Sequence, residues 1–416
     1  MARKNIEHNA PVFYFAKDFT LKYSRARMAC LLGGLAMMGP ISIDIFLPVI
    51  PSMAADLGVG IGNVELTLTA IFAGSAFGQI LYGPLSDRFG RKPIILFCIA
   101  MFGVSSVFIC LATSLNVIIF WRFMQGLLAA AGRTIANASA RDLYADDKLA
   151  SLISLIFIIS ISGSILNPIL GGYIVGVFSW NAVFIVMAIY SFVLFLAILF
   201  FFKETLEQLD LDAIKFCKLF QNLIFILKKP EYRLYLLSGG FALGAFIAFL
   251  SSSSGIAKIV FGLDPQSYSY YFASVIALSL FSNIITNQFI KLLGINLLIL
   301  VGGACQTIGG LLMLVFSLLE FPEPLSFFGP MGLFVLGFGL FWPLTTAKAL
   351  TPFDKRVGAA SSLLGFIQNL FGVAVSAILA LTIDGTTMPI ATAITICSLL
   401  SIATYLALPL LANFKT

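Results

Sequence analysis

The chain has 416 residues, of which 60% are apolar and only 11% are charged, and its mean hydropathy is +1.02. Soluble globular proteins carry far more charge, so the composition excludes that class. The formal net charge is +6, but the basic residues cluster at the ends of apolar stretches, so we predict no nucleic-acid partner.

The apolar residues form twelve stretches of the length that a helix needs to cross ~30 Å of hydrocarbon. Strands of a β-barrel would be shorter and would alternate strictly, so the sequence predicts an all-α integral membrane protein with twelve transmembrane helices. The first stretch has no signal-peptide cleavage site, and we expect it to direct insertion. The predicted spans are residues 29–50, 64–83, 93–112, 117–138, 149–177, 182–202, 234–251, 270–290, 297–318, 326–347, 358–381 and 389–411.

The Lys and Arg residues predict the orientation of these spans. With both termini in the cytoplasm, all but three of the 25 fall at cytoplasmic ends or loops, as the positive-inside rule requires. The exceptions are Lys258, which would lie outside, and Arg122 and Arg133, which lie within the fourth span. The lipid bilayer is therefore a predicted partner.

Asp44 is the most costly residue of the first span, because an ionised carboxylate in hydrocarbon carries a large penalty. Pro40, Pro48 and Pro51 disturb the helix around it. Such a carboxyl group faces a cavity or a partner, and one that binds a proton reversibly suits a proton carrier. The alternative is an aspartate hydrated in a water-filled mouth.

A dense polar segment, residues 83–93, separates the second and third spans and reads GPLSDRFGRKP. Gly83 and Gly90 permit a tight turn close to a neighbouring helix. Positive-inside topology explains its basic residues, Arg88 among them, but explains neither Asp87 nor the glycines.

Arg122 lies about five residues into the fourth span, which enters from outside, so its depth should match that of Asp44. We predict that it acts on proton binding by Asp44, directly or through water; alternatively it only binds backbone carbonyls. Arg133 follows eleven residues later, and eleven steps of ~100° return it close to the same face. Two inward arginines predict a cavity for a negative solute, with snorkelling of Arg133 to the headgroups as the alternative.

The fifth span combines small residues with a proline: Gly163, Asn167, Pro168, Gly171 and Gly172. Small residues permit close helix approach, and proline removes a backbone hydrogen bond and kinks a helix. We expect a tightly packed helix that blocks leakage between the two halves.

The longest polar interruption, residues 203–233, divides the spans into six and six. A shift of the chain by 204 residues aligns Gly90 with Gly294, each after the second span of its half. We therefore predict a cytoplasmic tail (1–27) and two pseudo-symmetric six-helix bundles (28–202 and 234–416), joined by a cytoplasmic linker (203–233). Within the linker, helical spacing predicts a helix lying on the membrane surface, formed by Leu211, Ile214, Lys215, Lys218, Leu219 and Phe220.

The inventory of reactive residues is sparse. The six cysteines are scattered without metal-ligand spacing, and we interpret them as packing residues. The only histidine, His8, lies in the N-terminal tail. The sequence therefore predicts no catalytic residue, no metal site and no cofactor.

Residues 83–92 resemble the loop signature of the major facilitator superfamily, Gly-x-Leu-x-Asp-Arg-x-Gly-Arg-Lys, at every defined position. Other segments are similar to the bicyclomycin-resistance (Bcr/CflA) type of twelve-span drug:proton antiporter. In the N-terminal half these are residues 44–48 with Pro51, 66–69, 78–79, 122–126, 141–144 and 204–206; the C-terminal half contributes residues 358–362.

The resemblance implies several roles. Asp44 would carry protons, and Asp87 would meet the start of the eleventh span near Gly358, where a helix N-terminus favours a carboxylate. Arg91 would pair with Asp142 at the end of the fourth span. These contacts would hold the cytoplasmic side closed and break when the cavity opens inward.

Residues 163–172 resemble the antiporter signature of the superfamily, which ends Gly-Pro-x-x-Gly-Gly, with Asn167 in place of the glycine before the proline. Six further polar residues are candidates for the substrate cavity, although polar groups between helices also serve as structural glue. They are Gln125, Asn137, Tyr190, Trp342, Gln368 and Asn369.

We interpret the chain as a monomeric, proton-coupled exporter of small, drug-like molecules in a bacterial cytoplasmic (inner) membrane, working by alternating access. Arg133 leaves open a dedicated exporter of an anionic metabolite or a metal chelator. An importer of the same fold is also open, because the topology does not fix the direction of transport. A membrane enzyme would need a cluster of nucleophilic, metal-binding or acid–base residues, and the sequence has none.

Overall fold

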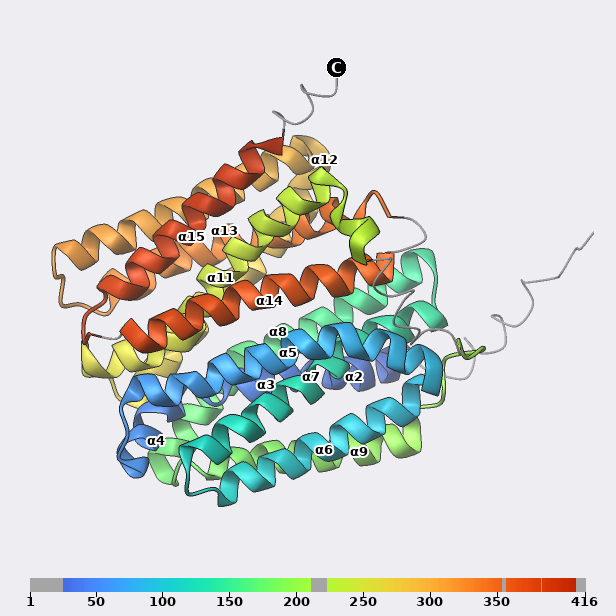
Figure 1. Ribbon diagram of the computed structural model, residues 1–416, viewed down its shortest axis with the longest axis horizontal. Helices are drawn as coiled ribbons and strands as arrows, with labels where there is room; N and C mark the ends of the chain where they lie inside the picture. Colours follow the sequence, from blue (N-terminus) through green and yellow to red (C-terminus); the bar gives the residue numbers. More distant parts are fainter. Residues whose placement is uncertain (1–24, 211–222, 354–356, 383, 409–416) are drawn as a thin grey trace, which may run out of the picture.

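The computed structural model describes residues 25–210, 223–353, 357–382 and 384–408. Its helices fall into two groups, α2 to α9 and α11 to α15, which lie side by side in Figure 1. In the first group the elements are α2 (Arg25–Ala36), α3 (Met38–Asp44), η1 (Leu47–Val49), α4 (Ile50–Leu57), α5 (Ile61–Phe89), α6 (Arg91–Leu111), α7 (Leu115–Leu143), α8 (Asp146–Val177) and α9 (Ala182–Phe201). The second group comprises α11 (Pro230–Ile259), α12 (Pro265–Leu318), α13 (Leu325–Leu350), α14 (Val357–Thr382) and α15 (Met388–Leu406).

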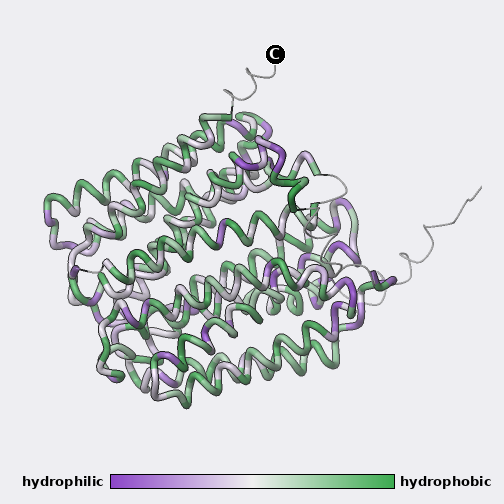
Figure 2. Tube along the Cα trace, viewed as in Figure 1, coloured by the Kyte–Doolittle hydropathy of each residue, from purple (hydrophilic) through white to green (hydrophobic). Residues whose placement is uncertain are grey.

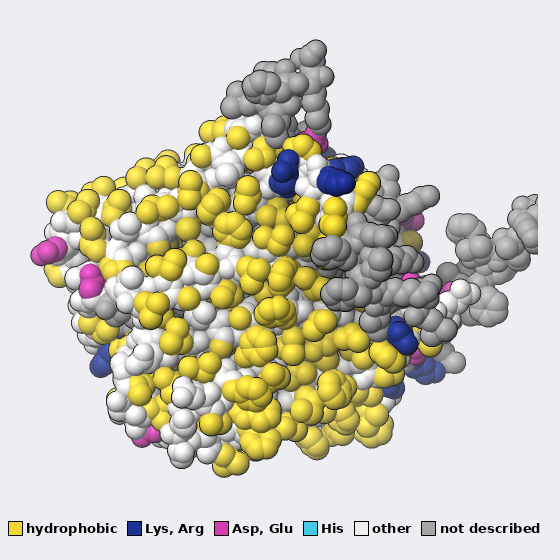
Figure 3. Space-filling view, viewed as in Figure 1, with side chains coloured by type: hydrophobic (Ala, Val, Ile, Leu, Met, Phe, Trp, Pro, Cys, Tyr) yellow, Lys and Arg dark blue, Asp and Glu magenta, His cyan; other side chains and the backbone are white. Residues whose placement is uncertain are grey.

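Twelve of these helical segments are long and apolar enough to cross a membrane, which confirms the predicted all-α class and the number of spans. Hydrophilic residues gather at the two ends of the molecule, while apolar residues dominate its middle (Figure 2). In Figure 3 hydrophobic side chains cover the middle of the visible face, and most of its Lys and Arg side chains lie at one end. The molecule thus has the polarity of a bundle that spans hydrocarbon.

We name the two ends by their connections. The basic end carries the connections at residues 90 and 144–145, and the described residues 202–210 and 228–229 that follow α9 and precede α11. The far end carries the connections at residues 58–60, 112–114 and 178–181. The surface helix predicted at Leu211, Ile214, Lys215, Lys218, Leu219 and Phe220 lies outside the described residues.

The first span is broken by its prolines. A proline lacks the N–H that would bond the carbonyl four residues earlier, so Pro40 and Pro48 free the carbonyls of Ala36 and Asp44. Helix α2 ends at Ala36 and α3 ends at Asp44, which matches this loss. The chain then continues through η1 and α4 toward the far end. Discontinuous helices of this kind place polar backbone groups inside a membrane bundle.

The predicted internal repeat is visible in the backbone. Gly90 separates α5 from α6 with φ 94° and ψ 152°, and Gly294 interrupts α12 with φ 76° and ψ 158°. Few residues other than glycine adopt this region. The two positions, 204 residues apart, therefore make the same turn between the second and third spans of each half.

The two groups meet along two seams, where α5 packs on α14 and α8 packs on α12. On the first seam the Thr69 and Ser376 hydroxyls lie 2.8 Å apart, and the Phe77 and Phe366 rings lie 5.7 Å apart. At the far end, η1 also contacts α11 and α12. Contacts between the halves thus reach the far end of the molecule.

Candidate functional site

Asp44 ends helix α3 at the break in the first span. Its side chain is only 6% exposed, and its carboxyl group has the Ser164 side chain of α8 as its hydrogen-bond partner. The second carboxyl oxygen, Oδ2, has no partner within the described structure. A buried, half-satisfied carboxyl group is costly when ionised, and this cost is a common property of functional groups inside membranes.

Two adjacent glycines bring α8 close to Asp44 and to the other half. A Cβ at Gly171 would collide with the carbonyl oxygen of Ile45 and lie 3.0 Å from Cγ of Pro48. A Cβ at Gly172 would collide with the Ser269 hydroxyl at the start of α12. The fifth span is therefore packed closely on both sides, as predicted, and only small residues permit this approach.

Asn167 and Pro168 lie within α8, which runs as one helix from Asp146 to Val177. Asn167 is 6% exposed, and its Nδ2 atom has no partner within the described structure. The proline frees the carbonyl of Ser164 from its backbone bond, on the same turn that faces Asp44.

Arg122 is fully buried, but it turns away from Asp44. Its Nη1 donates to the backbone carbonyl of Ser42 at 2.8 Å, and its guanidinium lies 3.8 Å from the centre of the Phe46 ring. Within the described residues no ion pair joins it to Asp44, so the direct form of the predicted interaction is absent in this conformation and the alternative, a bond to a backbone carbonyl, is present. Asp44 lies two residues from Ser42 and from Phe46, which at ~100° per residue is the opposite side of the helix. Asp44 and Arg122 were predicted to lie at the same depth in the membrane, but that did not make their side chains point toward each other.

Gln125 belongs to the same buried network rather than to a cavity. Its Oε1 accepts from Arg122 at 2.9 Å, and its Nε2 donates to the Ser106 hydroxyl at 2.9 Å and approaches Sδ of Met187 at 3.5 Å. The side chain is completely buried. The prediction that Gln125 lines the cavity is therefore wrong in this conformation, because both of its polar atoms serve the packing of the first bundle.

Arg133 differs from Arg122, since its side chain is exposed. It makes no hydrogen bond, ion pair or ring contact within the described part of the chain. Val117 and Phe120, which expose apolar surface, precede it by sixteen and thirteen residues, and steps of ~100° put them on the opposite side of α7. Arg133 thus presents a free guanidinium on the inner face of the helix, and not on the face turned to lipid.

Glu65 is a functional candidate that the sequence reasoning missed. It lies in the outer part of α5, it is completely buried, and its Oε2 accepts a hydrogen bond of 3.0 Å from Ser252 on α11 in the other half. Its Oε1 has no partner within the described residues. The signal was present, because an acidic residue inside an apolar span is as costly as Asp44; it was passed over because it belongs to no motif.

The polar segment 83–93 forms an ordered cluster at the basic end. Arg91 pairs with Asp87 at 2.6 Å and with Asp142 at 3.1 Å, and it also donates to the Ser86 hydroxyl at 2.6 Å. The predicted Arg91–Asp142 contact is present. The Arg88 guanidinium lies 5.5 Å from the centre of the neighbouring Phe89 ring.

The predicted contact of Asp87 with the start of α14 is absent from the described structure. A Cβ at Gly358 would have no atom within 4 Å, and Asp87 pairs with Arg91 instead. The segment approaches α14 one turn further on, where a Cβ at Gly83 would lie 3.9 Å from the Ser362 hydroxyl. Among the described residues, the contact proposed to close the basic end is thus not made.

Glu204 is a second residue whose role the sequence reasoning did not assign. Its Oε1 accepts from the backbone N–H of Arg91 and its Oε2 from that of Lys92, both at 3.0 Å. These are unpaired donors of the first turn of α6, and a carboxylate there is stabilised by the helix dipole. Glu204 therefore links the end of the sixth span to the turn at Gly90.

Most of the remaining cavity candidates already use polar atoms in hydrogen bonds within the protein. Tyr190 donates its hydroxyl to the carbonyl of Gly34, and Asn369 donates to the carbonyl of Gly365 at 2.8 Å. The Trp342 ring N–H donates to Gln368 at 3.0 Å, which leaves Nε2 of Gln368 buried without a partner in the described structure. Asn137 is half-buried, and its backbone carbonyl accepts from Arg141 at 3.3 Å.

Comparison with known proteins gives this arrangement a family. The profile of the Major Facilitator Superfamily matches residues 32–377. The chain belongs to this superfamily. Superfamily members are transporters of small molecules, so the chain is a multi-pass membrane transporter and not an enzyme.

Among characterised and uncharacterised superfamily relatives, the bicyclomycin resistance protein homolog of Haemophilus influenzae is 27% identical over 90% of this chain and 94% of its own length. An uncharacterised MFS-type transporter of Bacillus subtilis is 30% identical over 85% of this chain and 88% of its own. The multidrug resistance protein D of Escherichia coli is 27% identical over 81% and 84%. The resemblance to bicyclomycin-resistance transporters is thus confirmed.

Solved structures of superfamily transporters share the fold. The crystal structure of a D-xylose-proton symporter superposes with a TM-score of 0.74, covering 91% of this chain and 96% of that one, at 14% identity. A nucleoside transporter matches with a TM-score of 0.69 over 92% and 98%, again at 14% identity. Identity this low supports the fold alone.

Proposed function

We propose that this superfamily transporter exports small, drug-like molecules in exchange for protons. The proposal places it as a monomer in a bacterial cytoplasmic membrane, with both termini in the cytoplasm. Three relatives are named for resistance to bicyclomycin, chloramphenicol or several drugs, and they come from bacteria. The basic residues of the connecting segments support the orientation, since positive residues favour the cytoplasmic side.

The observation that carries proton coupling is the setting of Asp44. The carboxyl group is buried at a broken helix, has one side-chain hydrogen-bond partner and lacks a basic partner within the described residues. Protonation removes the cost of burying its charge, whereas ionisation restores that cost. A group of this kind favours different surroundings in its two protonation states, which is what couples a proton to a conformational change.

Alternating access follows from the contacts between the halves. In the described arrangement α8 packs on α12 near Asp44, and η1 contacts α11 and α12. We propose that the far end is closed in this state and that the substrate enters from the basic end. Proton binding at Asp44 from outside and proton release inside would then drive the return of the empty transporter.

The test is drug-driven proton release from purified protein reconstituted into liposomes with an imposed pH gradient. Asp44→Asn should bind drug yet lose proton release, because an amide cannot exchange a proton. Asp56→Asn is a matched control, since Asp56 lies on the same span but is exposed and accepts from Trp180 at 2.7 Å. Proton release of normal stoichiometry in Asp44→Asn would refute the carrier role. Drug movement that is independent of the pH gradient in the unmodified protein would refute coupling altogether.

A second candidate function, export of an anionic metabolite or a metal chelator, is favoured by Arg133 alone. Its free guanidinium lies on the inner face of α7, where an anionic group would find a partner. Transport of acidic solutes should fall in Arg133→Gln, while transport of cationic solutes should not. Arg141→Gln is the control, because Arg141 is also an exposed arginine of α7 but lies at the basic end. Equal transport of acidic solutes in Arg133→Gln and the unmodified protein would exclude this candidate.

A further inference from the structure

We propose that Glu65 is a second proton-binding site, which controls the contact between the two halves at the far end. The role of this site in coupling rests on the proposed proton-driven transport, although proton binding itself is a separate property. Glu65 lies on α5 of the first half and bonds to α11 of the second half, so its charge is part of the interface.

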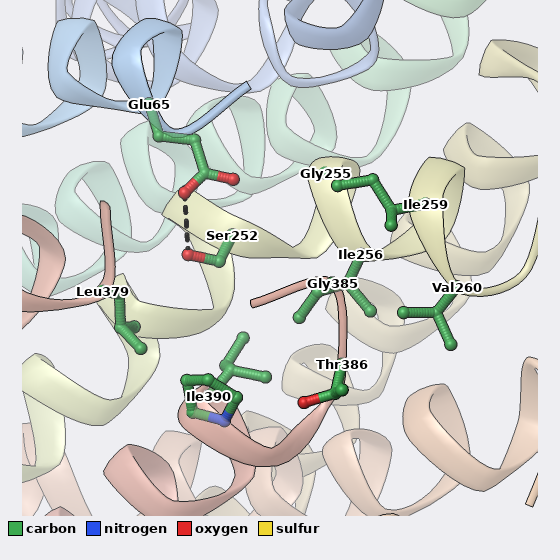
Figure 4. Close-up of a pocket in the computed structure, with 11 residues that line it drawn as sticks. Glu65, Ser252, Gly255, Ile256, Ile259, Val260, Leu379, Gly385, Thr386 and Ile390 are labelled. Carbon is green, nitrogen blue, oxygen red and sulfur yellow. Dashed lines mark hydrogen bonds between the residues drawn. The ribbon is translucent and has the colours of Figure 1, made fainter. Parts of the chain in front are cut away.

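The Glu65 carboxyl group is poorly compensated in the closed interface. Ser252 donates to Oε2 at 3.0 Å, and this is the only hydrogen bond that the described residues give the carboxyl group (Figure 4). The other oxygen, Oε1, lies against Gly255, where an added Cβ would come within 2.7 Å. Only glycine leaves room for the carboxyl group at this place on α11.

The charged and titratable groups around Glu65 do not neutralise it. The Tyr268 hydroxyl is paired with another neutral group, since it lies 2.8 Å from that of Ser253. Asp384 accepts from Thr386. Within the described residues no basic side chain pairs with Glu65. The charged groups on the described elements that pack on α5 are Asp56 on α4, Arg91 and Lys92 on α6, Arg122, Arg133, Arg141 and Asp142 on α7, and Glu231, Arg233 and Lys258 on α11. Asp44 on the first span, Tyr268 on α12 and Asp384 before α15 are further titratable groups on this side of the molecule.

A pocket beside Glu65 offers a path for a proton. It has room for about one water molecule, and its walls come from α11, from the end of α14 and from the start of α15. Figure 4 places Gly385 and Thr386, which belong to a far-end connection, across this pocket from α11. In the proposed arrangement this pocket is the way by which a proton from the far side reaches Glu65.

The sign of the effect follows from burial. When the halves are in contact, an ionised Glu65 is buried with one donor and no cation, which is costly, whereas a neutral carboxyl group avoids that cost. When the halves part, water solvates the carboxylate. Proton binding therefore favours the closed far end and proton loss favours the open one, and by linkage opening promotes proton loss.

The test measures the far end directly, without transport. Spin labels at Ala55→Cys and Thr382→Cys, exposed positions in opposite halves, report the distance between the halves in full-length protein in lipid nanodiscs, with the native cysteines replaced. In the otherwise unmodified protein, the fraction with separated labels should rise with pH. In Glu65→Gln it should stay low, about threefold or more below the unmodified protein at alkaline pH. Glu65→Asp retains a carboxyl group and should keep the pH response, which separates proton binding from packing.

The outcomes distinguish this inference from the proposed function. A pH response in Glu65→Gln equal to that of the unmodified protein would overturn the inference, whatever Asp44→Asn does. Loss of proton release in Asp44→Asn together with an intact response of the far end would support both. Normal proton release in Asp44→Asn, with a far-end response that Glu65→Gln abolishes, would refute the role of Asp44 and leave Glu65 as a proton site.

Discussion

Substitution of Gly90 by alanine tests how the polar segment 83–93 is built. Gly90 has φ 94°, and a Cβ there would lie 2.7 Å from Oε2 of Glu204. The backbone strain of a residue other than glycine in this region costs about 1–3 kcal/mol. Displacement of the carboxylate adds the loss of its hydrogen bond from the Lys92 N–H, worth about 1.5–3 kcal/mol for a charged acceptor.

The internal repeat supplies the control. Gly294 has nearly the same backbone conformation, with φ 76°, but a Cβ there would have no atom within 4 Å. Gly294→Ala therefore carries only the backbone strain. The difference between the two variants, about 1.5–3 kcal/mol, measures the contact with Glu204. Glu204→Ala should abolish that difference, because the added methyl group then meets no carboxylate.

The assay is thermal unfolding of the purified variants in one detergent, followed by protein fluorescence. For a bundle of this size, ~1 kcal/mol corresponds to roughly 2–4 °C, so Gly90→Ala should unfold several degrees below Gly294→Ala. In the Glu204→Ala background, alanine at the two positions should cost the same. Equal unfolding temperatures for the two single variants, or a difference that survives Glu204→Ala, would refute this account of the turn.

Three further predictions concern the contacts between helices. Asp87→Ala should insert and fold normally, because Arg91 keeps its bond to Asp142, but it should slow transport; a normal transport rate would contradict its proposed role at the basic end. Gly172→Leu should abolish transport and lower the unfolding temperature, since its side chain would displace α12, and unchanged flux would argue against the close seam. Arg122→Lys should lower the unfolding temperature by losing its stacking on a ring, yet retain drug-driven proton release, and loss of release would revive a link to proton binding.

Much of the architecture was predictable from local patterns. The spans follow from the length of the apolar runs, and the Arg91–Asp142 pair lies where the family signature predicts it. The glycines at 90 and 294 could be matched by their spacing alone, because only glycine suits the turn that both make. These features depend on residues near in sequence or on backbone conformation, which a sequence displays directly.

The relation between Asp44 and Arg122 was not predictable from depth. Two residues at one level of the membrane interact only if their helices turn the right faces to each other, and here Ser42 and Phe46, rather than Asp44, face Arg122. The face of Asp44 is set by the packing of α8 against the broken helix. Glu65 was missed for a related reason, since its importance comes from an interface with the other half of the chain.

The polar contacts between the halves suggest where protonation acts. On the seam between α5 and α14, Thr69 and Ser376 share a neutral hydroxyl contact of 2.8 Å, whose net worth of about 1 kcal/mol does not change with pH. The seam between α8 and α12 relies on small residues in close contact. The free energy of contacts of these two kinds does not depend on the protonation of a carboxyl group. The Glu65–Ser252 contact is different, because its free energy depends on whether the carboxyl group carries a proton. A proton bound there changes the balance between open and closed far ends, whereas the Thr69–Ser376 contact has no carboxyl group to protonate.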